Sequence, residues 1–150
     1  MTPQQVLAAD PASGPPLPTV LVADDEEAVR SLLRVALPRL GYRPLLAADG
    51  DEALRLYREH AADVRAALLD VLMLGRDGPA TLAGLRALCP HLPCAFMTGY
   101  AGGYRSEDLL ALGADGVIAK PFRLDELGGV LGRLCARAVA PAGGSCLGPA

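Results

Sequence analysis

Hydrophobic residues along the chain alternate between two patterns. Short apolar runs of four to six residues, typical of buried strands, are separated by stretches in which apolar residues recur every three or four positions, as on one face of a helix. This alternation predicts an α/β fold in which a parallel sheet is covered by helices on both faces. The expected strands are residues 19–23, 43–47, 66–70, 93–98 and 116–119. The expected helices are 29–40, 52–59, one beginning near Pro79, one capped by Ser106, and 124–138.

Two of these helices carry residues that weaken them. Pro38 lacks a backbone donor and should kink or loosen the last turn of the first helix, which Gly41 then ends. The last helix contains Gly128, Gly129 and Gly132, each of which costs about 1 kcal/mol relative to alanine.

Composition divides the chain into three parts. Residues 1–18 are rich in proline and alanine and are expected to be a flexible leader, and residues 139–150 a similar tail. The range 19–138 is expected to be one folded domain, since 51% hydrophobic residues in the chain exclude disorder throughout. A net charge of −3 provides no basic surface for nucleic acid, so no direct binding to nucleic acid is expected.

Targeting signals and cysteines indicate the compartment. No signal peptide and no apolar run of about 20 residues is visible, so we expect a cytoplasmic protein that does not enter a membrane. The four cysteines form no CxxC pair; free thiols in a reducing cytosol are the favoured interpretation, with a disulfide or a structural zinc left open. His60 and His91 are interpreted as surface residues.

Polar residues gather where the expected strands end. Asp24 and Asp25 follow the first strand, Asp70 ends the third, Thr98 the fourth, and Lys120 follows the fifth. Carboxyl ends of parallel strands share one edge, where ligands bind. Three carboxylates there favour Mg²⁺ together with a phosphoryl group. Taken singly, each residue has a simpler explanation as a helix cap, a turn or a solvated lysine, but their combination favours a phosphoryl site with Asp70 as nucleophile.

Five motifs then carry a family resemblance. VLVADDEEAVRSLL, AADGDEAL, LLDVLMLGRDG, MTGYA and IAKPF follow one another in order over about residues 19–138. In this combination the chain resembles the receiver domain of bacterial two-component response regulators. The resemblance implies a doubly wound, flavodoxin-like (βα)5 fold, a three-layer sandwich whose five parallel strands have the order 2-1-3-4-5.

The resemblance also implies roles for individual residues. Asp25 would bind Mg²⁺ directly and Asp24 largely through water, with Mn²⁺ as a substitute metal; the backbone carbonyl of Leu72 would complete the site. Asp70 would be the phosphoacceptor. Thr98 and Lys120 would contact the phosphoryl group, a cis peptide before Pro121 would aim Lys120 inward, and Gly78 would serve a turn with unusual backbone angles.

Partners follow from the same resemblance. The phosphodonor would be a histidine kinase or a histidine phosphotransfer protein, and a downstream protein would bind the last two helices and the fifth strand. Because no output region follows residue 138, the chain is expected to be a single-domain regulator, a phosphorelay intermediate or a receiver excised from a larger hybrid kinase, with the Pro/Ala-rich ends slightly favouring the single-domain form. We expect no enzymatic activity beyond its own phosphorylation and dephosphorylation.

The sequence departs from the family pattern at the switch. Val117 stands where the family usually has Tyr or Phe, so either Tyr100 or Tyr104 takes over the readout of activation, or that readout is muted. Tyr100 and Leu72 occupy positions where the family tunes dephosphorylation.

Two other functions stay open at this point. A phosphohydrolase of the haloacid dehalogenase type also uses an aspartate nucleophile, but it needs a second aspartate where Leu72 stands. A degenerate receiver acting as a constitutive interaction module is the other alternative.

Overall fold

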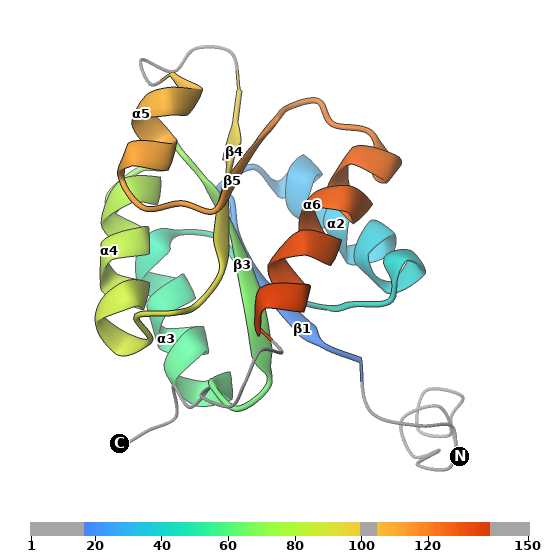
Figure 1. The fold of residues 1–150 in the computed structure, drawn as a ribbon, viewed down its shortest axis with the longest axis horizontal. Helices are drawn as coiled ribbons and strands as arrows, with labels where there is room; N and C mark the ends of the chain where they lie inside the picture. The colour runs from blue at the N-terminus through green and yellow to red at the C-terminus, as the bar shows by residue number, and fades with distance from the viewer. Residues whose placement is uncertain (1–16, 100–104, 139–150) are drawn as a thin grey trace.

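The computed structural model describes residues 17–99 and 105–138. Its elements alternate strand and helix throughout, and the five strands form one parallel sheet in the order β2-β1-β3-β4-β5 (Figure 1). This confirms the fold predicted from the sequence and its resemblance. The strands are β1 (Thr19–Ala23), β2 (Arg43–Ala47), β3 (Val64–Asp70), β4 (Cys94–Thr98) and β5 (Gly116–Ala119). The helices are α2 (Glu27–Leu40), α3 (Gly50–His60), α4 (Gly78–Leu88), α5 (Ser106–Ala111) and α6 (Leu124–Ala138).

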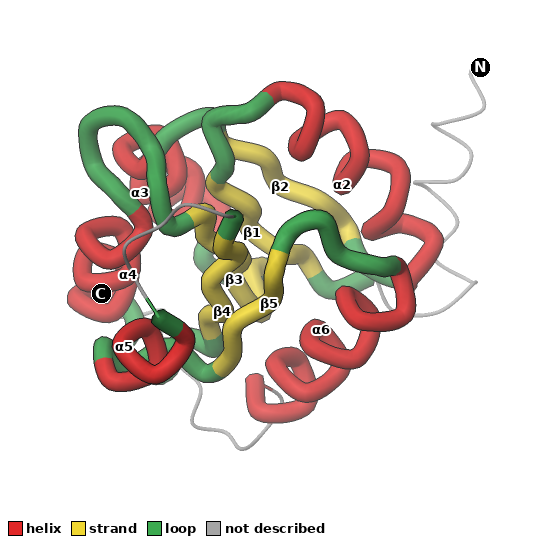
Figure 2. The backbone as a smooth tube through the Cα atoms, turned by 90° about the horizontal axis from the view of Figure 1, so that it is seen from above, coloured by secondary structure: helices red, strands yellow, loops and turns green. Residues whose placement is uncertain are grey.

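Helices cover both faces of the sheet. Helices α3, α4 and α5 lie on one side, and α2 and α6 on the other (Figures 1 and 2). Successive residues of a strand therefore enter different cores: Leu21 packs with the α3–α4 layer, whereas Val20 and Val22 pack with α2 and α6. Burial on both faces explains why the central strands are continuously apolar and why Asp70 stands out among them.

The end of α2 shows why Gly41 stops that helix. Gly41 has a φ of 96°, a conformation that favours glycine, and its N–H donates to the carbonyl of Pro38 at 3.1 Å. The next N–H, that of Tyr42, donates to the carbonyl of Leu37 at 2.9 Å. The helix continues through Pro38 as far as Leu40, so the proline does not end it.

Some boundaries differ from those expected. Helix α3 begins at Gly50 because Asp49 caps it, accepting a hydrogen bond from the N–H of Glu52 at 2.8 Å. The expected cap of α5 was wrong by one residue: Ser106 is the first helical residue and Arg105 is the cap. The N–H of Arg105 donates to the side chain of Asp108 at 3.2 Å.

The remaining expectations have mixed outcomes. His60 and His91 are exposed, as expected. Cys94 and Cys135 are free thiols, but Cys89 is disulfide-bonded, contrary to the favoured interpretation. Cys146, the tail, and all but the last two residues of the leader lie outside the described residues. Across the described ranges, every helix is too short or too polar to cross a bilayer.

Candidate functional site

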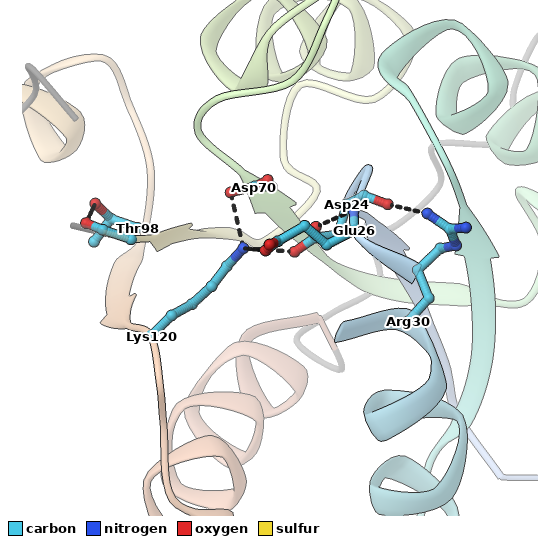
Figure 3. Close-up of polar contacts among 7 residues, drawn as sticks. Asp24, Glu26, Arg30, Asp70, Thr98 and Lys120 are labelled. Carbon is cyan, nitrogen blue, oxygen red and sulfur yellow. Dashed lines mark hydrogen bonds and ion pairs between the residues drawn. The ribbon is translucent and has the colours of Figure 1, made fainter. Parts of the chain in front are cut away.

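The sheet brings Asp24, Asp70 and Lys120 to one edge. Asp24 directly follows β1, Asp70 ends the neighbouring β3, and Lys120 directly follows β5. The ammonium of Lys120 lies 2.8 Å from Oδ2 of Asp24 and 3.2 Å from Oδ1 of Asp70 (Figure 3). One cation therefore bridges two buried carboxylates whose strands are adjacent in the sheet.

Asp24 is fixed at every polar atom. Its side chain is fully buried; Oδ1 accepts a hydrogen bond from the N–H of Glu26 at 2.9 Å, and Oδ2 accepts from Lys120. Its carbonyl accepts from the guanidinium of Arg30 at 2.8 Å, and its N–H donates to the carbonyl of Ala47 at 3.1 Å. A carboxylate held this firmly is a pre-oriented ligand rather than a mobile surface group.

Asp70 carries the strongest electrostatic perturbation of the site. Burial first, then the charge of Asp24 and, less strongly, that of Asp25 raise the pKa of Asp70 from its usual 3.8 to a net value of about 6, although Lys120 lowers it. For Lys120, burial alone lowers the pKa, but contacts with Asp24 and then Asp70 outweigh burial and raise it. The site thus holds more negative charge than Lys120 alone neutralises.

The donor set suits a hard divalent cation. Asp24, Asp25 and Asp70 each offer a carboxylate oxygen, and these oxygens lie within 4.8 Å of one another. Carboxylate oxygens are the ligands that Mg²⁺ prefers, and a divalent charge would offset the negative charge that raises the pKa of Asp70. The residues present therefore fit Mg²⁺.

The acidic cluster lies in a pocket with a volume of about 650 Å³. Asp25, Asp70, Thr98 and Lys120 contribute to its walls, so the pocket contains most of the site residues expected from the sequence. The hydroxyl of Thr98 donates to the carbonyl of Gly99 at 3.2 Å, and Figure 3 shows Thr98 apart from the Asp70–Lys120–Asp24 cluster. Glu26, Gly99 and six apolar residues form the rest of the pocket wall; the apolar residues are Val29, Leu32, Val71, Leu72, Pro121 and Phe122.

The segment after Asp70 depends on a close backbone approach at Gly78. A Cβ at Gly78 would lie 2.5 Å from the carbonyl oxygen of Asp70 and 2.9 Å from Cα of Val71. The expected unusual backbone angle at Gly78 was wrong, because Gly75 is the glycine of this segment with a positive φ, 78°. Glycine at 78 is required by space rather than by conformation, and it lets α4 start directly against the end of β3.

Residues at the expected switch are only partly described. Val117 is half-buried and packs against the core between the sheet and α3–α5. Tyr100 and Tyr104 lie outside the described residues. The peptide bond between Lys120 and Pro121 is cis.

Two contacts at the site involve residues that sequence reasoning did not identify. Glu26 contacts the ammonium of Lys120 at 3.3 Å, and Arg30 binds the carbonyl of Asp24. The available signal was their position: Glu26 follows the aspartate pair and Arg30 lies one helical turn further on, so both face the end of β1.

Comparison with known proteins gives consistent similarities. A family model described as a response regulator receiver domain matches residues 20–131. The chain is 40% identical over 108 residues to Response regulator MprA of Mycobacterium sp. (strain KMS), covering 72% of this chain and 46% of that protein. It is 38% identical over 109 residues to Sensor kinase CckA of Brucella abortus (strain 2308), covering 73% of this chain and 12% of that protein.

A solved structure supports the same similarity. The receiver domain of NtrX from Brucella abortus superposes with a TM-score of 0.72 at 31% identity, covering 78% of this chain and 98% of that one. The chain thus spans less than half the length of the two curated relatives, but nearly all of an isolated receiver domain.

Proposed function

Because the chain belongs to the response regulator receiver domain family, we propose that Asp70 accepts a phosphoryl group from a phosphohistidine donor in a Mg²⁺-dependent reaction. One observation carries the proposal: a buried carboxylate at a strand end lies 3.2 Å from a lysine ammonium and beside two further carboxylates. The receiver would extend over residues 19–138 and act as a regulatory phosphoacceptor rather than as an enzyme on other substrates.

The reaction is a transfer between two nucleophiles. A carboxylate oxygen of Asp70 forms a bond to phosphorus while the phosphorus–nitrogen bond of the donor breaks, and the imidazole keeps that electron pair and takes up a proton. Asp70 must be ionised to attack, and the charge of bound Mg²⁺ would favour this ionised form. When bound by Asp24, Asp25, Asp70 and the carbonyl of Leu72, Mg²⁺ would neutralise charge on the phosphoryl oxygens.

The protein supplies mainly position and charge to such a transfer. Lys120 is already beside Asp70 and can donate to a phosphoryl oxygen without a large movement. The hydroxyl of Thr98 would turn from the carbonyl of Gly99 toward the phosphoryl group.

The partners proposed are those of the family. The donor would be a histidine kinase or a histidine phosphotransfer protein, and the phosphorylated chain would bind a downstream protein through α5, β5 and α6, in the cytoplasm. The single-domain arrangement stays a prediction, because the curated relatives MprA and CckA are longer proteins.

The test is a phosphorylation assay followed by intact mass spectrometry. Incubation with acetyl phosphate and Mg²⁺ should add one phosphoryl mass to the chain, and Asp70→Asn should abolish the addition. Repeated turnover of varied phosphoesters would indicate a phosphohydrolase instead. No adduct on the wild-type chain would leave the constitutive interaction module as the better explanation.

A further inference from the structure

Lys120 contacts a third carboxylate that has no part in the proposed transfer. Oε1 of Glu26 lies 3.3 Å from the ammonium, beside the contacts to Asp24 at 2.8 Å and Asp70 at 3.2 Å (Figure 3). An ammonium group has three N–H donors, so the three carboxylates can occupy all of them. While Asp70 is still an ionised nucleophile, a phosphoryl oxygen of the incoming donor can bind Lys120 only if one of these contacts is given up.

The three carboxylates differ in what they lose when released. The Asp24 side chain is fully buried and that of Asp70 is 7% exposed, so neither would gain water in place of the ammonium. The Glu26 side chain is 62% exposed and makes the longest of the three contacts. Exposed ion pairs contribute little, so the contact to Glu26 is the one that Lys120 gives up at the lowest cost.

From this geometry, and resting on the function proposed above, we propose that Glu26 is a positioning residue: it holds the Lys120 ammonium in the unphosphorylated state and releases it to the phosphoryl oxygen. Glu26 therefore slows phosphorylation in two ways. It occupies a donor that the phosphoryl group needs, and it places a negative charge at the pocket through which an anionic donor enters.

The side chain of Glu26 can be changed without disturbing its backbone contact. The N–H of Glu26 donates to Oδ1 of Asp24 at 2.9 Å, and this bond remains in a glutamine variant. Glu27, the next residue, is an exposed glutamate in the first turn of α2. Within the described parts of the chain Glu27 forms no ion pair, so Glu27→Gln is a matched control that removes the same charge one residue away.

The first measurement is the initial rate of adduct formation on the full chain, with acetyl phosphate and Mg²⁺, followed by intact mass. Glu26→Gln is expected to react about two- to fivefold faster than wild type, the range that corresponds to an exposed ion pair of about 0.4–1 kcal/mol. Glu27→Gln should react more slowly than Glu26→Gln. Equal rates for the two variants would overturn the inference while leaving the proposed function intact. No adduct in any variant would overturn both.

The second measurement needs neither metal nor phosphodonor. In ¹⁵N-labelled chain without Mg²⁺, the ammonium signal of Lys120 should shift in Glu26→Gln and stay unchanged in Glu27→Gln. A purely structural effect on α2 would not single out this signal in one variant. An unchanged Lys120 signal in Glu26→Gln would show that the contact is absent in solution and would overturn the inference.

Discussion

Replacing Asp70 by asparagine is expected to stabilise the fold in the absence of Mg²⁺. The pKa of Asp70 rises from 3.8 to about 6 on folding, mainly because the carboxyl is buried and secondly because Asp24 lies beside it. A rise of this size corresponds to about 3 kcal/mol of destabilisation once the carboxyl is fully ionised. The attraction to Lys120 is already included in that pKa, and the 7% exposure of the Asp70 side chain leaves little screening by water.

The sign follows from the direction of the shift. A carboxyl whose pKa is raised in the folded state favours folding when protonated, so its contribution is fully present below pH 3.8 and is lost as pH rises through about 6. Asparagine has nearly the same shape and cannot ionise. The stability difference between Asp70→Asn and wild type should therefore be small near pH 4 and grow to about 3 kcal/mol at pH 7.5.

Urea unfolding of both proteins between pH 4 and pH 8, in buffer with a metal chelator, measures this difference directly. For a chain of this length, about 3 kcal/mol also corresponds to a rise in Tm of roughly 10 °C at neutral pH. Asp63→Asn is the control, since Asp63 is an exposed aspartate away from the pocket. Equal stability of wild type and Asp70→Asn across this pH range would refute the conclusion that uncompensated negative charge is concentrated on Asp70.

Three further substitutions and the addition of Mg²⁺ test the site and its support. Gly78→Ala should lower the free energy of unfolding by about 1–3 kcal/mol in urea unfolding, because the new methyl group meets the Asp70 carbonyl. Gly132→Ala should instead stabilise α6 by up to about 1 kcal/mol, because no neighbouring atom lies within 4 Å of its Cβ position. Asp115→Ala should cost about 2 kcal/mol, since its carboxylate accepts from the N–H of Cys94 and from a guanidinium, but should leave the rate of adduct formation unchanged. Saturating Mg²⁺ at about 100 times its Kd should raise the free energy of unfolding of wild type by about 2.7 kcal/mol, and that of Asp70→Asn by less, as measured by urea unfolding with and without the metal.

The fold could be predicted because the hydrophobic pattern of each strand and helix agrees with its place in a parallel sheet covered by helices on both faces. Strands buried on both faces are continuously apolar, and helices that cover them show apolar residues on one face only, so the two patterns are distinct along the chain. Gly41 marked a helix end because only a left-handed residue closes that turn. Arg105 could not be identified as a cap, since its contact comes from a backbone N–H that every residue but proline possesses.

The polar edge was predictable for a geometric reason. Strand ends that are far apart in sequence become neighbours in a parallel sheet, so Asp24, Asp70 and Lys120 could be placed together before any contact was known. Gly78 was assigned the wrong reason for being glycine, because a clash with the carbonyl of Asp70 depends on how the following segment folds back onto the strand. The sequence shows that residue 78 is glycine, but it does not show that the Asp70 carbonyl is the neighbour that excludes a larger side chain.

The contacts of Lys120 show why fold stability and the proposed phosphorylation of Asp70 make opposite demands on the charge at this edge of the sheet. Its single positive charge is shared among Asp24, Glu26 and Asp70, and Asp25 lies close enough to add a further negative charge. More positive charge in the resting protein would stabilise the fold, but it would also lower the pKa of Asp70 and occupy the place of the metal and the phosphoryl group. Because the carboxylates are incompletely neutralised in the empty site, binding of a cation there would stabilise the protein most strongly. On the function proposed above, the raised pKa of Asp70 is the electrostatic cost of a pocket that receives a cation and a phosphoryl group together.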